Sequence, residues 1–355
     1  MNRLEQIAKK LPDYQIDAML ILSEPGRLYA TRFHSTAGAV LVTGEGSYFF
    51  TDSRYIEAAR RRVDGAAVEE STRERSTYQL IGEALQRHGV QRLGYEEAYT
   101  TVAEFERLKK RIEAQLCPAS ALLGELRAVK DGWEIEQMVK AQRIAEAALT
   151  ETLNFIRAGR TEKEIAAFLQ YQMLLRGAEK MSFDPIVVSG ANSSMPHGVP
   201  TDKAVEAGDF LTMDFGCIYN GYCSDMTRTV AVGQVSEEME RVYDAVLRAQ
   251  AAGIAVAKAG VSGAEIHAAG EAVLAEAGYG AFFGHGFGHS LGVEIHESPN
   301  AAPGWTAPLP AGTVLSAEPG VYLPGRFGVR IEDVIVLQEG GCEDITLAPK
   351  DLLIL

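Results

Sequence analysis

Asp214 and Asp225 are two carboxylates in the segment AGDFLTMDFGCIYNGYCSDMTRTVAV. Apolar runs rich in β-branched residues flank Asn220-Gly221, a dipeptide that accepts the positive φ angles of a type I′ turn and predicts a tight hairpin. With a two-residue loop there, Asp214 faces Thr227 and is a diagonal neighbour of Asp225. Because side chains alternate between the faces of a strand, we expect both carboxylates on one face, roughly 7–8 Å apart.

A pair of carboxylates on one face has two interpretations. Two short acids at this spacing can share two metal ions that lie roughly 3.5–4 Å apart. Buried like charges repel, so either one acid is protonated or a cation lies between them. The alternative is that both aspartates are ordinary turn and edge residues in contact with water, which is the commoner case for an isolated pair.

A second segment repeats the first, about 100 residues later. AGDFLTMDFG aligns with AGTVLSAEPG, so that Asp214 corresponds to Glu318 and Asp225 corresponds to Glu332. If the second hairpin turns at Gly325, Glu318 faces Glu332 directly. The upstream stretches AGRTEKEI and AGVSGAEI repeat as well. A period this long exceeds the roughly 20–50 residues of solenoid units and predicts a duplicated, pseudo-twofold domain.

Duplication strengthens the metal interpretation. Each hairpin offers a carboxylate pair, and two related hairpins would bring four acids to the middle of one domain. Four buried acids without cations carry a prohibitive desolvation and repulsion cost. The sequence therefore predicts a divalent metal site.

Histidines supply the remaining chemistry. The stretch GHGFGHSLGVEIH places His285 and His289 at the HxxxH spacing of a zinc-binding helix, but glycine at four of its positions disfavours a helix. We expect an extended strand with close backbone approach, in which His285 and His289 share a face. His296 would point to the other face unless a bulge intervenes. His197 lies in the loop MPHGVP just before the first hairpin.

Composition describes the protein that must position these groups. The chain has 355 residues, of which 46% are apolar and 23% charged, which is typical of about two soluble domains. A net charge of −14 disfavours a nucleic-acid partner. The apolar run Ala18–Leu22 is too short for a signal peptide or a membrane span, so we expect a cytoplasmic protein with no membrane partner. Four cysteines without CxxC spacing predict neither a disulfide nor a zinc knuckle.

Two domains are predicted, covering residues 1–122 and 131–355, with residues 123–130 as a linker. The first alternates helical and strand-like stretches and is a small α/β domain. In it we expect strands at 18–22, 38–42 and 47–51 and helices at 80–89 and 102–112. The second opens with a capping box, Asp131 with Glu134. In it we expect helices at 133–158, 161–177, 237–260 and 262–278.

Several motifs of the chain resemble those of one enzyme family. MDFG, SDMTRT, HGFGHSLG, AEPG and VRIED are similar to the metal-site signatures of the pita-bread-fold metallopeptidase family, M24, which includes methionine aminopeptidase, aminopeptidase P, prolidase and creatinase. The first domain resembles the creatinase-like N-terminal domain of aminopeptidase P and prolidase. Methionine aminopeptidases usually lack that domain and creatinase lacks the ligands, so both fit less well. The resemblance implies an α/β creatinase-like domain followed by an α+β pita-bread catalytic domain.

The resemblance also implies a site. Two divalent ions are expected, Mn²⁺ first with Co²⁺, Zn²⁺ or Fe²⁺ as alternatives, held by Asp214, Asp225, His289, Glu318 and Glu332. Glu318 would also shuttle the proton. His197, His285 and His296 match histidines that contact substrate or support the ligands. Arg330 matches an arginine that would orient a ligand carboxylate.

The function implied is metal-assisted hydrolysis of the Xaa-Pro bond at the N-terminus of a peptide whose second residue is proline, by a homodimer. Spacing alone does not show proline specificity. One alternative is prolidase, which is restricted to Xaa-Pro dipeptides. Another is a non-catalytic pita-bread module that binds peptides; such a module would be expected to have lost ligands, whereas this chain keeps all five.

Overall fold

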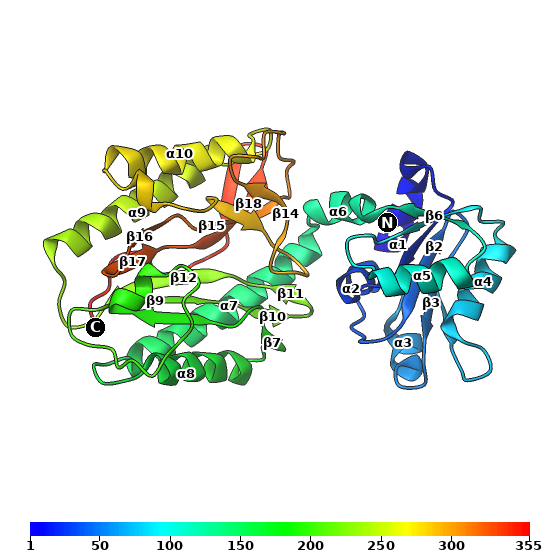
Figure 1. Cartoon of the computed structure of the whole chain (residues 1–355), viewed down its shortest axis with the longest axis horizontal. Helices are drawn as coiled ribbons and strands as arrows, with labels where there is room; N and C mark the ends of the chain where they lie inside the picture. The colour runs from blue at the N-terminus through cyan, green and yellow to red at the C-terminus, as the bar shows by residue number, and fades with distance from the viewer. The chain divides into compact units, whose positions relative to one another are not determined.

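The computed structural model describes residues 1–355, which form two compact units, Met1–Arg127 and Ala128–Leu355 (Figure 1). The segment 123–130, predicted as a linker, spans this division and contains the end of helix α6 (Ser120–Ala128). No helix of the chain combines the length and the apolar character needed to cross a membrane.

The first unit is built on a six-stranded sheet, as the alternating pattern predicts. Its strands are β1 (Ala18–Ile21), β2 (Ala39–Thr43), β3 (Ser47–Thr51), β4 (Ala67–Glu70), β5 (Arg92–Tyr95) and β6 (Gln115–Pro118). Their order in the sheet is β4-β3-β2-β1-β5-β6. The central strand β1 pairs antiparallel with β2 and parallel with β5, so the sheet is mixed.

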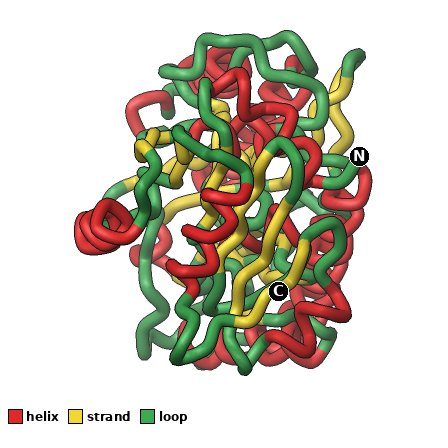
Figure 2. Tube along the Cα trace, turned by 90° about the vertical axis from the view of Figure 1, so that its right-hand side faces the viewer, coloured by secondary structure: helices red, strands yellow, loops and turns green.

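Helices cover both faces of this sheet (Figure 2, helices red and strands yellow). They are α1 (Arg3–Lys10), α2 (Glu24–Thr31), α3 (Ile56–Arg62), α4 (Thr77–Arg87), α5 (Val102–Arg111) and α6, with a 3₁₀ turn η1 at Leu11–Tyr14. Alternate residues of one strand enter different cores: Met19 packs with residues of α1 and α6, and Leu20 packs with residues of α4 and α5. The period-2 alternation of a strand buried on both faces explains this split.

The second unit contains four long helices: α7 (Gly132–Phe155), α8 (Glu162–Leu175), α9 (Glu237–Val256) and α10 (Gly263–Glu276). The predicted capping boxes at Asp131/Glu134, Thr161/Glu164 and Ser262/Glu265 are all confirmed. Helices α9 and α10 lie on one side of the strands and α7 and α8 on the other (Figure 1).

The first hairpin has the predicted register. Strands β9 (Phe210–Phe215) and β12 (Met226–Ala231) pair so that Asp214 faces Thr227. Beyond a break at Gly216, β10 (Cys217–Tyr219) and β11 (Tyr222–Cys223) continue to the turn. Asn220 and Gly221 both have positive φ, as a type I′ turn requires.

The second hairpin also has the predicted register. β15 (Val314–Ala317) pairs with β18 (Asp333–Gln338), and β16 (Gly320–Leu323) pairs with β17 (Phe327–Arg330). Glu318 and Glu332 lie in the gap between these two ladders, at positions that the shared register places opposite each other.

The duplication is confirmed by equivalent contacts in the two halves. The residue before α8 bridges a downstream strand segment, Thr161 with Ala204, and the residue before α10 does the same, Ser262 with Pro308. The remaining strands complete the small sheets around the hairpins. They are β7 (Lys180–Met181), β8 (Ile186–Ser189) and β19 (Gly341–Asp344), with 3₁₀ turns η2 (Gly190–Ser194) and η3 (Gly280–Phe282).

The histidine-rich stretch differs from the extended strand that its glycines predict. Only β13 (Gly288–Ser290) is a strand, and it pairs with β14 (Glu297–Ala301) across a bulge. His285 precedes the strand and His296 ends the loop between the two strands. Because the chain reverses in that loop, His296 returns to the side of His289, and their rings lie 4.5 Å apart between centroids.

Candidate metal and active site

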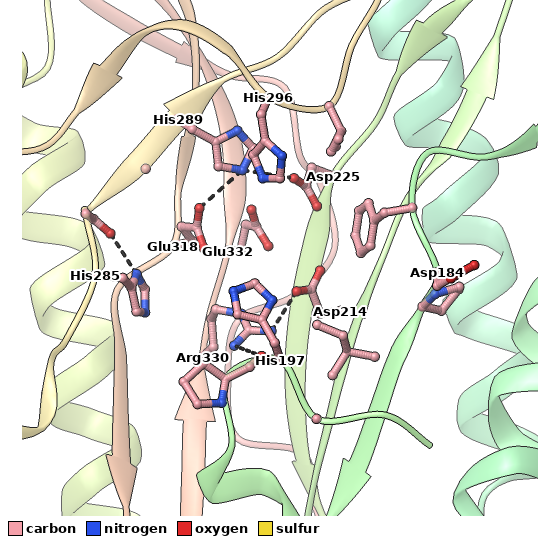
Figure 3. Close-up of a pocket in the computed structure, with 18 of the residues that line it drawn as sticks. Asp184, His197, Asp214, Asp225, His285, His289, His296, Glu318, Arg330 and Glu332 are labelled. Carbon is pink, nitrogen blue, oxygen red and sulfur yellow. Dashed lines mark hydrogen bonds and ion pairs between the residues drawn. The ribbon is translucent and has the colours of Figure 1, made fainter. Parts of the chain in front are cut away.

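All the predicted site residues line one cavity of about 750 Å³ in the second unit. They come from both halves of the duplicated domain and point toward one another (Figure 3). The set is Asp214, Asp225, His289, Glu318, Glu332, His197, His285, His296 and Arg330.

The two hairpins deliver the carboxylates to the cavity. Asp214 lies near the end of β9 and Asp225 directly precedes β12. Glu318 directly follows β15 and Glu332 directly precedes β18. In Figure 3 the aspartates and the glutamates face each other across the cavity, as the register of the repeat predicts.

The donor atoms of Asp225, His289 and Glu332 lie within 4.8 Å of one another. His289 Nε2 is 3.5 Å from a carboxylate oxygen of Asp225 and 3.3 Å from one of Glu318. The Oδ1 atoms of Asp214 and Asp225 are buried and accept no hydrogen bond. Buried acceptors without a donor are costly, and a cation between them removes that cost. The donor set therefore fits divalent metal ions.

Burial and mutual repulsion raise the pKa values of three of these carboxylates. Burial raises the pKa of Asp225 well above its usual range, and the charges of Asp214 and Glu318 raise it further. Burial likewise raises the pKa of Glu332, with the charge of Asp225 next in importance. The pKa of Glu318 is raised in the same direction, mainly by burial. These shifts are those of the metal-free protein, in which the buried carboxylates hold protons more tightly than in water.

We expect the metal-free protein to lose stability as the pH rises. The folded-state pKa values of Asp225 and Glu332 lie above the ordinary values of 3.8 and 4.5, so the folded state holds protons that the unfolded chain releases. The resulting stability is complete below about pH 4 and is lost as the pH rises through the folded-state values, by up to about 1.4 kcal/mol per pH unit for each group. Thermal unfolding of metal-free protein from pH 5 to 8 measures this, and added Mn²⁺ should flatten the profile. A metal-free profile that is already flat would contradict the expectation.

His289 is oriented as a ligand. Its Nδ1 lies 3.2 Å from the carbonyl oxygen of Ser290, which can only accept, so Nδ1 carries the hydrogen. The lone pair of Nε2 then faces Asp225 and Glu318. Burial lowers the pKa of His289, which favours the neutral imidazole that a metal requires.

Arg330 connects the two hairpins. Its guanidinium donates to Asp214 Oδ2 at 2.6 Å, to the Tyr322 hydroxyl at 2.8 Å and to Thr227 Oγ1 at 3.0 Å. Thr227 in turn donates to Glu332 at 2.7 Å. The predicted role of Arg330, orienting a carboxylate, agrees with this geometry, since it holds Asp214 directly and Glu332 through Thr227.

The sequence analysis missed three polar residues of the site. Thr227 faces Asp214 in the hairpin register, and that register could have identified it. Tyr322, whose hydroxyl also lies 3.0 Å from His285 Nε2, follows Glu318 by four residues and so shares its strand parity. Ser316, which donates to Glu318 at 3.0 Å, shares that parity as well.

His197 differs from the other histidines. It is exposed on the loop that follows η2, beside Arg330 in Figure 3. No hydrogen bond or ion pair holds its imidazole, so the backbone of the loop alone sets its position.

Comparison with protein families accounts for both units. Residues 136–339 match the metallopeptidase family M24, and residues 3–129 match the creatinase/prolidase N-terminal domain. Together these ranges include nearly the whole chain.

Individual relatives match over their full length. The uncharacterized peptidase YqhT of Bacillus subtilis is 41% identical, over 99% of this chain and 100% of the relative. The structure of an Xaa-Pro dipeptidase from Bacillus anthracis is 40% identical with a TM-score of 0.96, covering 99% of both chains. That of an X-Pro aminopeptidase from Thermotoga maritima is 36% identical with a TM-score of 0.93, covering 98% of this chain and all of the other.

Proposed function

Because the chain belongs to metallopeptidase family M24 and carries the creatinase/prolidase N-terminal domain, we propose that it is an Xaa-Pro aminopeptidase. It is a metallopeptidase whose relatives include both Xaa-Pro dipeptidases and aminopeptidases. Its fold class is the predicted one, a creatinase-like domain followed by a pita-bread catalytic domain. The alternative of a non-catalytic module has no support in these relatives.

The scarcity of lysine and arginine side chains in the cavity favours an aminopeptidase. A dipeptidase recognises a free carboxylate one residue beyond the scissile bond, and a buried carboxylate requires a charged or multiple hydrogen-bonding partner. No lysine lines this cavity, and its one arginine is Arg330. That guanidinium is only 3% exposed and already bonded to Asp214, Tyr322 and Thr227. A longer peptide presents a neutral amide there instead.

The lining of the cavity points in the same direction. It includes Phe183, Val199 and Pro200 together with the exposed Asp184. Apolar side chains suit the body of a peptide, whereas the carboxylate of Asp184 repels a C-terminal carboxylate. The volume of about 750 Å³ lies in the upper part of the 300–1,000 Å³ range of small-molecule pockets.

The predicted ligands Asp214, Asp225, His289, Glu318 and Glu332 would hold two divalent ions, on which family M24 depends. Such ions supply Lewis acidity that acidifies a water molecule and polarises the scissile carbonyl. We propose Mn²⁺, because a set of four carboxylates and one imidazole suits it. The homodimer and the cytoplasmic location stay predictions.

The chain's own residues would move the proton and stabilise the developing charge. Glu318 accepts the proton of the attacking water and passes it to the leaving proline nitrogen. Its raised pKa suits a group that must hold a proton briefly. His296 lies beside His289 and donates to the oxyanion of the tetrahedral intermediate, with His197 on the opposite side of the cavity.

Replacing His296 with alanine should lower kcat by about 10²–10³-fold and change KM little, because a donor to the oxyanion acts in the transition state. Steady-state kinetics on Ala-Pro-Ala measure both constants. His34→Ala, at an exposed histidine of the first unit, is the matched control. A change confined to KM would assign His296 to substrate binding alone.

Peptide length tests the proposed function. The metal-loaded enzyme is given Ala-Pro-Ala, Ala-Pro and Ala-Ala-Ala at equal concentration, and the products are identified by mass spectrometry. We expect cleavage of the Ala-Pro bond in the tripeptide, with kcat/KM at least about 10-fold above that for the dipeptide, which corresponds to about 1.4 kcal/mol. Preference for Ala-Pro would make the enzyme a prolidase, and preference for Ala-Ala-Ala would remove proline specificity.

A further inference from the structure

A buried glutamate lies outside the metal cluster at the start of helix α8. Glu162 is the first residue of that helix and is 0% exposed. Its carboxylate accepts hydrogen bonds from three residues: from the amide and hydroxyl of Ser189 at 2.7 and 2.9 Å, from Asn192 Nδ2 at 3.1 Å, and from the amide and hydroxyl of Thr201 at 2.9 and 2.7 Å. Five donor groups thus converge on one carboxylate, which offers about four lone-pair sites.

These donors enclose the loop that carries His197. Ser189 ends β8 and Thr201 follows His197 in the loop, so Glu162 joins the two ends of the segment 189–201. The backbone of the helix start adds to this, since the amides of Glu162 and Lys163 donate to the carbonyls of Lys203 and Thr201 at 3.0 and 3.1 Å. The free N-terminal amides of the helix and the carboxylate therefore hold the same loop.

The other half of the duplicated domain lacks this glutamate. Gly263 occupies the corresponding first position of α10, and a Cβ there would lie 2.0 Å from the carbonyl oxygen of Asn300. In that half the chain approaches the helix start by its backbone, with the amide of Ala264 donating to Trp305 at 2.8 Å. A glutamate at this position is thus no requirement of the repeated fold, and in the first half its carboxylate contacts the segment that carries His197.

We propose that Glu162 is a positioning residue for His197. The imidazole of His197 has no side-chain partner, so its place in the cavity depends on how the loop is anchored. Near its middle the segment is held by the other half of the domain, through Arg330 to the carbonyl of Pro196 at 3.4 Å and through the amides of Gly328 and Gly325 to the hydroxyls of Ser193 and Ser194 at 2.9 and 3.3 Å. Glu162 joins its two ends. The proposal rests on the proposed function only in that His197 assists the hydrolysis.

Glu162→Gln tests this with little change in shape. The new NH₂ group faces a backbone amide and the NH₂ of Asn192, which can only donate, so the loop loses part of its anchor. We expect kcat for Ala-Pro-Ala to fall about 10–100-fold, since small misplacements of catalytic groups cost about this much. In the His197→Ala background the same substitution should change kcat less than 2-fold, because the group it positions is already absent. An equal fall in both backgrounds would overturn the proposal.

Glu164→Gln is the matched control. Glu164 follows Glu162 by two residues in the same helix. It caps the helix by accepting from the amide of Thr161 at 2.8 Å, but it does not contact the loop. Glu164→Gln should weaken the start of the helix. His197→Ala should lower kcat by the same factor with and without Glu164→Gln. Titration with Co²⁺ should show that both metal-free variants bind this ion as tightly as the original protein does, because neither glutamate contacts a predicted metal ligand.

Hydrogen exchange separates this proposal from the proposed function. In Glu162→Gln the amides of residues 189–203 should exchange at least about 10-fold faster, with those of β9 and β12 unchanged, whether or not the protein cleaves peptides. Unchanged exchange in 189–203 would overturn the anchoring role. An original protein inactive on every peptide would instead refute the proposed function, and the exchange result would still decide the role of Glu162.

Discussion

Asp225→Asn should reduce kcat for Ala-Pro-Ala by at least about 10³-fold while the protein remains folded. Asp225 is 3% exposed, has a carboxylate oxygen within 4.8 Å of donor atoms of His289 and Glu332, and carries an oxygen without a hydrogen-bond partner. Asparagine keeps the size but replaces one oxygen with an NH₂ group that repels a cation. Metal ions contribute several kcal/mol of transition-state stabilisation, and each 1.36 kcal/mol is a factor of ten in rate.

Stability separates this loss from unfolding. In the metal-free protein Asp225 lies among like charges, so its neutralisation removes repulsion, and the Tm of metal-free Asp225→Asn at pH 8 should equal or exceed that of the original protein. Asp202→Asn is the control, because its exposed carboxylate pairs only with Lys163. Full activity of the purified Asp225→Asn protein would refute the assignment of Asp225 as a metal ligand.

Glu318→Gln should lower kcat by about 10²–10⁴-fold, the range expected when a general acid–base group is removed. The Glu318 side chain is 18% exposed, lies 3.3 Å from His289 Nε2 and accepts from Ser316. Glutamine keeps a carbonyl oxygen that can still bind a cation, but it cannot take up the proton of the attacking water. The rate should therefore stay low even at saturating metal.

Metal titration distinguishes the two roles predicted for Glu318. kcat is measured over a range of Mn²⁺ concentrations, beside Co²⁺ binding to the metal-free variant by calorimetry. Recovery of the original kcat at high Mn²⁺ would make Glu318 a ligand only and remove it from proton transfer. Glu339→Gln, on an exposed turn of the same unit, serves as the control.

The carboxylate positions could be predicted because short-range rules determine them. Asn220-Gly221 specifies a two-residue turn, and the turn fixes which residues face each other. The internal repeat then transfers the argument to Glu318 and Glu332. The observed pairing of Asp214 with Thr227 and of Ala317 with Asp333 agrees with both registers.

The remaining parts of the site depend on contacts that strand parity does not determine. The position of His296 depends on a loop that reverses between β13 and β14, where Gly292 allows many conformations. Glu162 looks like any acidic residue in the first turn of a helix, and its burial becomes visible only once the loop 189–201 is folded onto it. Such contacts join segments far apart in sequence, which periodicity cannot show.

The most direct test of the central claim is a titration of metal-free protein with Mn²⁺ while the hydrolysis of Ala-Pro-Ala is followed. We predict no activity without metal, a rise in activity that levels off near two equivalents, and release of alanine from the N-terminus by cleavage of the Ala-Pro bond. Activity that persists without metal, or that appears only on Ala-Ala-Ala, would contradict a dinuclear Xaa-Pro peptidase.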